Sequence, residues 1–277
     1  MPFVFGVDLA KQVFQVHTVD EATGQVKRWT LSRTKLTELF SNAAPAIIAM
    51  DACGSSHHWA RRFAAMGHEV RLIATKFVRP FVKTNKTDAA DAAAIWEAAQ
   101  RPDMRFVPVK NEQQQGILAI HNMRNLLVKD RTAQIHQIRA VFYEFGIELP
   151  KGRHWGLKAL PAAFASAEGR VETMVLEALR DQLELIHELT RRIERIEQQL
   201  EMYERTDERC QRLRAIPGVG PLTATAVPIS TTSGGIRITS EAIFISKASI
   251  FLPRYSGVRP TIRPATNTAT MANISIP

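Results

Sequence analysis

The chain has 277 residues, of which 45% are apolar, and this is the composition of a globular protein with one large domain or two smaller ones. Cys53 and Cys210 are its only cysteines and lie far apart, which excludes a disulfide scaffold and a cysteine-rich zinc cluster. With no signal peptide and no apolar run near the roughly 20 residues of a membrane helix, we expect a cytoplasmic protein without membrane contacts, and its net charge of +9 favours a polyanionic partner.

The first hundred residues predict an α/β domain built on an open sheet. Residues 3–31 contain three short strands, because apolar residues there are β-rich or alternate with period two. The elements expected after them are a serine-capped helix at 32–40, a buried strand at 46–51, a helix at 55–67 closed by Gly67, a strand at 68–74 and a helix from Asp88.

Two long helices are expected next. Residues 112–145 read as one helix with an apolar stripe and with Arg124, Arg131 and Arg139 inside an arc of roughly 80°. Residues 167–209 read as a second helix, which favours either a coiled coil or a buried helix of a bundle. Its apolar seam comprises Leu179, Leu183, Ile186, Leu189, Ile193, Ile196, Leu200 and Tyr203.

The C-terminal part changes character along its length. Gly218 and Gly220 predict a tight turn between two apolar helices, which is either a plain helical corner or a site whose backbone N–H groups bind phosphate. After about residue 228, Ser, Thr and Ile dominate, Glu241 is the only acid, and helical periodicity is lost.

Four aspartates share a structural pattern. Asp8 ends the first predicted strand, Asp51 ends the strand at 46–51, and Asp88 and Asp91 lie three residues apart on one face of a helix. Ligands gather at the carboxyl ends of strands in open sheets. If the first and fourth strands are neighbours, the four carboxylates lie close together and would repel one another unless divalent cations neutralise them. Oxygen-only ligation suits Mg²⁺ (or Mn²⁺), and two such ions can clamp a phosphodiester. For a single acid such as Asp88, a favourable position at a helix N-terminus remains the alternative.

Several long segments in order resemble one family. "GVDLAKQVFQVH", "MDACGSSHHWARRF", "KTNKTDAADAAAIWEAAQRP" and "IPGVGPLTATA" are similar to IS110-family transposases, and within them to the IS1111 branch. The resemblance covers about residues 3–227. It implies an RNase H-like (RuvC-type) domain with a DEDD acidic set at 1–110, long helices and a coiled coil at 111–209, and a small, mainly helical transposase domain at 210–277 that is atypical after about residue 228.

The resemblance also implies a function. A DNA transposase or recombinase of an insertion sequence would use the acids and a C-terminal serine, guided by a structured RNA, as a nucleoid-associated dimer or tetramer. Asp8, Asp51, Asp88 and Asp91 match the DEDD set, although the family usually has glutamate where this chain has Asp51. Arg124, Lys129, Arg131 and Arg139 would contact phosphates of DNA or RNA, with the alternative that they are solvated.

Two serines could serve as the nucleophile that the resemblance implies. Ser233 lies in a local "TTSGG" that resembles the family's "SSGG", but too close to Gly220, whereas Ser256 has the family's spacing and is preferred. Nothing near Ser256 supplies the base or metal that a serine nucleophile needs. Two other functions stay open, namely a Mg²⁺-dependent RuvC-like nuclease and an inactive, truncated nucleic-acid-binding relic.

Overall fold

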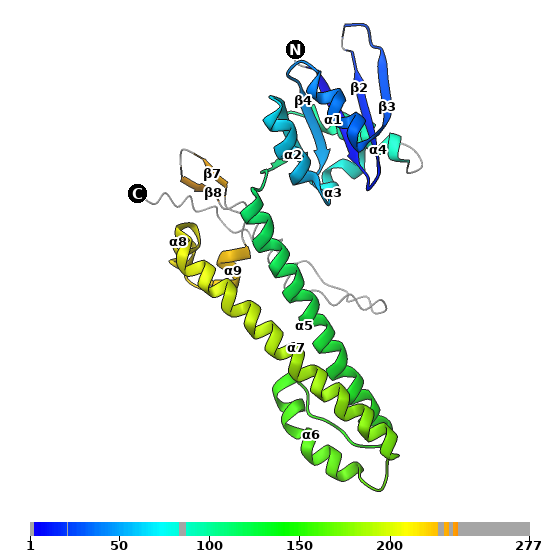
Figure 1. The fold of residues 1–277 in the computed structure, drawn as a ribbon, viewed down its shortest axis with the longest axis vertical. Helices are drawn as coiled ribbons and strands as arrows, with labels where there is room; N and C mark the ends of the chain where they lie inside the picture. The colour runs from blue at the N-terminus through cyan, green and yellow to red at the C-terminus, as the bar shows by residue number, and fades with distance from the viewer. Residues whose placement is uncertain (1–2, 21, 83–86, 227–229, 233–234, 238–277) are drawn as a thin grey trace, which may run out of the picture.

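The computed structural model describes residues 3–20, 22–82, 87–226, 230–232 and 235–237. An α/β domain is followed by a long helical arm that leads away from it and returns (Figure 1). None of the helices in these ranges is long and apolar enough to cross a membrane.

The N-terminal domain is built on a six-stranded mixed sheet of order β3-β2-β1-β4-β5-β6. β1 pairs antiparallel with β2 and parallel with β4, which in turn pairs parallel with β5. The strands are β1 (Val4–Leu9), β2 (Val13–Val19), β3 (Val26–Ser32), β4 (Ile47–Asp51), β5 (Glu69–Ile73) and β6 (Phe106–Val107). This arrangement fits an RNase H-like domain. The strands and helices predicted up to the helix at Asp88 all occur in the predicted order, with two short unexpected elements before that helix.

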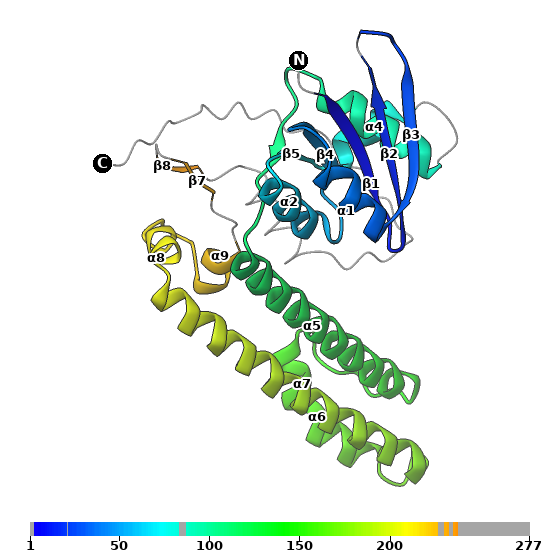
Figure 2. The ribbon, with the colours of Figure 1, turned by 45° about the horizontal axis from the view of Figure 1, so that its top comes forward.

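Helices cover both faces of the sheet (Figure 2). On one face α1 (Arg33–Ser41) and α2 (Ser56–Ala65) pack on alternate strand residues such as Phe14 and Val16. On the other face α4 (Asp88–Ala99) packs on residues such as Ala49 and Ile73. The period-two alternation of the strands thus divides their apolar residues between two cores, which bury the sheet on both sides.

Three short elements were not expected from the sequence. These are α3 (Thr75–Val78), the 3-10 turn η1 (Arg79–Phe81) and β6. Each has two to four residues, which is too short for hydrophobic periodicity to be visible.

The helical arm is a hairpin of α5 (Glu112–Glu144) and α7 (Thr173–Thr206). Arg124 forms an ion pair with Glu197, and Arg131 Nη1 donates to Thr190 Oγ1 at 3.4 Å. As the residue number rises along α5 it falls along α7, so the two helices are antiparallel.

The apolar seam of α7 lies inside the chain. Leu179 and Ile186 are buried in the core that α7 forms with α5 and the segment joining the two helices, and Ile193 is buried as well. The bundle interpretation therefore accounts for the seam, because packing within one chain already covers it.

The prediction of one helix over 167–209 is wrong at both ends. α6 (Arg153–Ala167) is a separate helix that packs at the far end of the arm, where the Phe164 ring lies edge-on to Phe142 at 5.2 Å. Gly169 then adopts a positive φ of 70°, which a helix cannot contain, and α7 starts only at Thr173.

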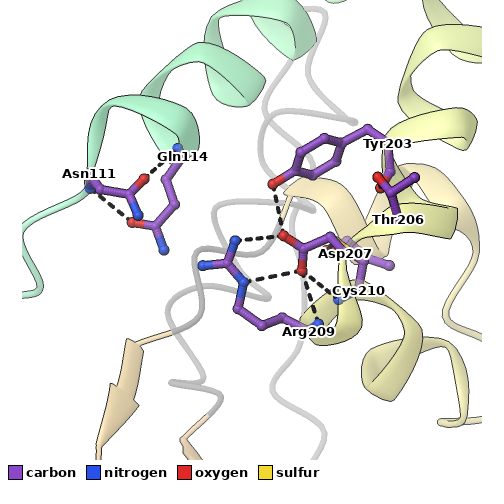
Figure 3. Close-up of polar contacts among 8 residues, drawn as sticks. Asn111, Gln114, Tyr203, Thr206, Asp207, Arg209 and Cys210 are labelled. Carbon is purple, nitrogen blue, oxygen red and sulfur yellow. Dashed lines mark hydrogen bonds and ion pairs between the residues drawn. The ribbon is translucent and has the colours of Figure 1, made fainter.

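A capping box starts α5 (Figure 3). The Asn111 side chain accepts the backbone N–H of Gln114 at 2.8 Å, and the Gln114 side chain accepts the N–H of Asn111 at 3.0 Å. Asn111→Ala should therefore lower the free energy of unfolding by about 1 kcal/mol in urea denaturation. Asn111→Asp, which keeps an acceptor, is the control, and an equal loss in both variants would contradict a capping role.

The arm ends in two short helices, α8 (Glu208–Arg214) and α9 (Pro221–Ala226), joined by a turn in which Gly218 has a φ of 86°. This confirms the predicted tight turn. Buried Cys210, Leu213 and Ala224 form its small core, and His121 Nε2 lies 3.0 Å from Thr225 Oγ1, which ties α9 to α5.

Asp207 is the centre of a polar network at the corner between α7 and α8 (Figure 3). Its carboxylate accepts the backbone N–H groups of Arg209 and Cys210, the guanidinium of Arg209, and the hydroxyl of Tyr203 at 2.9 Å. The hydrogen bond from the Arg209 side chain is the largest of the effects that hold the pKa of Asp207 well below its ordinary value, against the opposing effect of burial.

This network predicts acid sensitivity. A carboxyl whose pKa is depressed on folding stabilises the protein above its unfolded pKa of about 4, and that stability is lost as the pH falls below it. Asp207→Asn should therefore cost about 1–3 kcal/mol at pH 7 and progressively less toward pH 3 in urea denaturation. A difference from the parent protein that stays constant between pH 7 and pH 3 would contradict the assignment.

Beyond α9, the described residues form two short paired strands, β7 (Ser230–Thr232) and β8 (Gly235–Arg237). The predicted nucleophiles, Ser233 and Ser256, lie outside the described residues.

Candidate metal centre

Two acids are placed by neighbouring strands. β1 and β4 run parallel with Val7 opposite Met50, so Asp8 and Asp51 follow side by side at the same edge of the sheet. The first and fourth strands are therefore neighbours in the sheet, which a cluster of these acids requires.

The other two acids come from the N-terminal turn of α4. Thr87 caps this helix, its hydroxyl accepting the N–H of Ala90 at 3.2 Å, which fixes Asp88 and Asp91 in the first turn. Gly6 of β1 lets α4 lie close to the sheet, because a Cβ there would stand 2.3 Å from the carbonyl oxygen of Ala92. This close approach brings the helix acids to the strand ends.

Three of the four carboxylates converge. Asp8, Asp88 and Asp91 each offer an oxygen, and these oxygens lie within 4.8 Å of one another. Asp88 is exposed and the other two are half-buried, so the group faces solvent on one side. Three carboxylates this close repel one another, and oxygen donors alone are the set that a hard divalent cation prefers, so the residues fit such an ion.

Asp51 does not belong to this three-acid group. Its carboxylate instead accepts the Thr75 hydroxyl, at 2.8 Å to Oδ1 and 3.0 Å to Oδ2. Burial raises the pKa of Asp51, and the charge of Asp91 raises it further, while the hydrogen bond from Thr75 opposes both effects. Asp51 is thus close enough to Asp91 to feel its charge but is held by another partner.

Sequence reasoning missed Thr75. The residue is the second after β5, which is the strand next to β4, so it reaches the same edge of the sheet as the acids. The sequence predicts that Thr75 follows a strand end, but it does not predict the hydrogen bond from Thr75 to Asp51.

Cys53 lies beside the same edge. Burial, followed by the charges of Asp51 and Asp8, raises the pKa of the Cys53 thiol. At neutral pH the group is therefore a neutral thiol, which makes it a weak nucleophile.

The predicted phosphate-binding arginines make contacts within the arm. Arg124 pairs with Glu197, Arg131 donates to Thr190, and Arg139 donates to the Leu149 carbonyl at 3.1 Å. Lys129 is exposed. Of the two glycines, Gly218 takes the positive φ of the turn, and the Gly220 carbonyl accepts the backbone N–H groups of Thr223 and Ala224 in α9.

A half-buried polar junction that the sequence did not reveal joins the α/β domain to the arm. Lys110 Nζ lies 2.9 Å from His57 Nε2, and Arg61 donates to the Lys110 carbonyl at 2.6 Å and to Gln115 at 2.7 Å. Burial, with the charges of Lys110 and Arg61, lowers the pKa of His57 to about 4. The imidazole is therefore neutral at pH 7, and its Nδ1 accepts the backbone N–H of Lys110 at 3.2 Å.

Comparison with known proteins gives a consistent family. The family model for DEDD transposases of the IS110 group, described as a transposase, matches residues 5–146. A probable family 20 transposase of Pseudomonas aeruginosa is 44% identical over 226 residues, which are 81% of this chain and 67% of the relative. The transposase for insertion sequence element IS1328 of Yersinia enterocolitica is 38% identical over 222 residues, or 80% and 66%.

A further relative is the transposase for insertion sequence element IS1111A of Coxiella burnetii, which is 37% identical over 227 residues, or 81% of this chain and 62% of the relative. The chain thus spans about two thirds or less of the length of these relatives. The family model covers the α/β domain with all four acids and α5, and the predicted resemblance is confirmed: the chain belongs to the IS110 family of DEDD transposases.

Proposed function

We propose that this chain acts as the transposase of an insertion sequence, cutting and rejoining DNA at the edge of the sheet where Asp8, Asp88 and Asp91 meet. The convergence of their three oxygens within 4.8 Å carries the proposal. Family membership and the relatives' names support it, as does the net charge of +9, which favours binding to a polyanion.

Asp8, Asp88 and Asp91 would hold Mg²⁺ (or Mn²⁺), and Asp51 would complete the site. A bound divalent cation supplies charge stabilisation to a phosphodiester under attack and lowers the pKa of a bound nucleophile. The chain's own contribution is placement, since the strand ends fix two of the carboxylates and the capped turn of α4 fixes the other two.

The resemblance adds a serine step, for which Ser256 is the preferred residue and Ser233 the other candidate. The serine Oγ would bond to phosphorus, the bond from phosphorus to the leaving sugar oxygen would break, and that oxygen would take the proton. Rejoining reverses this exchange and regenerates the hydroxyl. A structured guide RNA and a dimer or tetramer belong to the same proposal, with Lys129 and the arginines of α5 as candidate phosphate contacts.

The proposal is tested with the full chain purified after co-expression with the element's flanking non-coding DNA. Recovery of a discrete RNA, together with Mg²⁺-dependent joined products and a covalent protein–DNA adduct, is the expected result. Mg²⁺-dependent cuts without any adduct would overturn strand transfer in favour of a RuvC-type nuclease.

A nucleic-acid-binding relic is the second candidate, because the sequence loses its helical periodicity after about residue 228, where the family's transposase domain would continue. Salt-dependent binding of RNA or DNA, without cleavage in either Mg²⁺ or Mn²⁺, would identify it. A log–log salt slope near zero would show that the binding does not rest on contacts with phosphates, and would contradict this candidate.

Asp51→Glu should strengthen metal binding. The added methylene extends the reach of the carboxylate by about 1.5 Å, so the side chain can leave Thr75 and join the three-acid group. A further charged ligand should tighten Mn²⁺ binding about tenfold in isothermal titration. Asp51→Asn is the matched control, because it removes the charge and keeps the length of the side chain. Mn²⁺ binding by Asp51→Glu that is equal to or weaker than that of the parent protein would contradict the prediction and show that Asp51 needs no longer side chain to bind the metal.

A further inference from the structure

A hollow lies on the side of α4 opposite the candidate metal centre. It has a volume of about 340 Å³ and is formed by β2, β3, η1 and α4. Its principal side chains are His17, Arg28, Phe81, Thr87, Trp96 and Glu97.

The two sides of α4 are separated by its helical period. At about 100° per residue, Ala90, Ala93 and Glu97 lie on the side opposite Asp88 and Asp91. The hollow is lined there by alanines, whose small side chains leave the space open. One of its lining residues, Thr87, directly precedes Asp88 in the sequence. The hollow and the metal centre are therefore neighbours, although they lie on opposite sides of α4.

The wall of the hollow is aromatic and has spare hydrogen-bonding capacity. The rings of His17 and Trp96 meet edge to face with centroids 5.6 Å apart. His17 is only 5% exposed, and within the described part of the chain neither its Nδ1 nor the buried Trp96 Nε1 has a hydrogen-bond partner. A buried polar atom without a partner is costly, so such atoms point to a ligand.

The state of the histidine limits what can bind. Burial, and then the charge of Arg28, lower the pKa of His17, so its ring is neutral at pH 7. A neutral imidazole offers one N–H donor and one nitrogen acceptor, and the indole of Trp96 offers one donor. The matching ligand is flat, aromatic and bears both donors and acceptors on its edge.

The rim adds charge recognition. Arg28 lies on β3 directly opposite His17 and is exposed, so its guanidinium can meet a phosphate at the mouth of the hollow. Glu97 is already paired with Arg101 at 3.0 Å, and half-buried Phe81 provides an additional ring. A small pocket with two aromatic walls, donors, acceptors and a cation at its mouth has the chemistry of a nucleotide site.

We propose that this hollow holds one unpaired base of the nucleic acid on which the neighbouring acid group acts, with Arg28 on its phosphate. The role of the base in the reaction rests on the proposed function, whereas the binding of a base in the hollow does not. A base held outside the stack, on the side of α4 opposite the acids, would fix the register of the strand that reaches the metal centre, at the unstacking cost that base-extruding enzymes bear.

The test observes the indole N–H of Trp96 in the full chain. With ¹⁵N-labelled tryptophan, the Trp96 signal is assigned by its loss in Trp96→Phe, and the protein is titrated without metal with the four deoxynucleoside 5′-monophosphates. We expect saturable shifts of that signal by at least one nucleotide and none by deoxyribose 5-phosphate or inorganic phosphate. No shift with any nucleotide, or equal shifts with inorganic phosphate, would overturn the proposal.

Matched variants locate the contact. Arg28→Gln should weaken nucleotide binding about tenfold. Lys27→Gln removes the charge of the neighbouring exposed residue, which lies outside the hollow, and should leave nucleotide binding unchanged. Equal weakening by both variants would show a diffuse charge effect and contradict the site. Because binding is measured without metal, Trp96 shifts in a protein that cuts no DNA would refute the proposed function alone, and cleavage without shifts would refute the pocket alone.

Discussion

Gly6→Ala is expected to lower the free energy of unfolding by more than about 3 kcal/mol, at the upper end of the costs of overpacking. A Cβ at this position would stand 2.3 Å from the Ala92 carbonyl oxygen and 2.6 Å from the Trp96 backbone nitrogen. Both contacts are with backbone, so no side chain can rotate away and the whole of α4 must shift. Urea denaturation followed by circular dichroism measures the loss.

Gly116→Ala is the matched control for this substitution. Gly116 lies within α5, where an added Cβ meets nothing within 4 Å, and alanine favours a helix over glycine by up to ~1 kcal/mol. The same chemical change should therefore stabilise the protein at Gly116 and destabilise it at Gly6. A small effect at Gly6 would mean that α4 is free to lie farther from the sheet, and Asp88 and Asp91 with it.

Asp91→Asn is expected to weaken Mn²⁺ binding by at least ~10²-fold, which corresponds to about 2.7 kcal/mol. The substitution keeps the size of the side chain but removes one of the three charges whose oxygens lie within 4.8 Å. Any Mg²⁺-dependent DNA cleavage should fall with it. Isothermal titration with Mn²⁺ and a plasmid-nicking assay provide the two readouts.

The stability of the metal-free protein separates this effect from unfolding. Removing one of three mutually repelling charges should leave the thermal midpoint without metal no lower than in the parent protein. Asp130→Asn, which changes an exposed acid of α5 in the same way, should alter neither metal binding nor cleavage. Unchanged Mn²⁺ affinity in Asp91→Asn would refute a metal centre at Asp8, Asp88 and Asp91.

The candidate site was largely visible in the sequence, because each of its acids is marked by a local signal. Asp8 is the penultimate residue of β1, Asp51 is the last residue of β4, and Asp88 and Asp91 follow a threonine cap at the start of a helix. Strand ends and helix starts are set by short-range patterns, and parallel strands bring their carboxyl ends to one edge. The positions of these acids relative to the elements could therefore be predicted.

The grouping of the acids could not be predicted in the same way. Asp51 stands apart from the other three acids because its carboxylate accepts a hydrogen bond from the hydroxyl of Thr75, which follows β5. Similarly, the arginines of α5 looked free on a helical wheel, yet Arg124 pairs with Glu197 of α7, 73 residues later. Such contacts join segments that are distant in sequence, and no local pattern encodes them.

The sequence by itself determined the order of the α/β elements, the tight turn at Gly218, the four acids and the family, because these depend on residue types at short spacings. Only the tertiary structure decided that α7 covers its apolar seam with α5 of the same chain, that Gly6 lets α4 lie close to the sheet, and that a hollow opens beside the paired rings of His17 and Trp96. The physical reason is that packing depends on which surfaces meet, and a surface buried by one partner is no longer available to another.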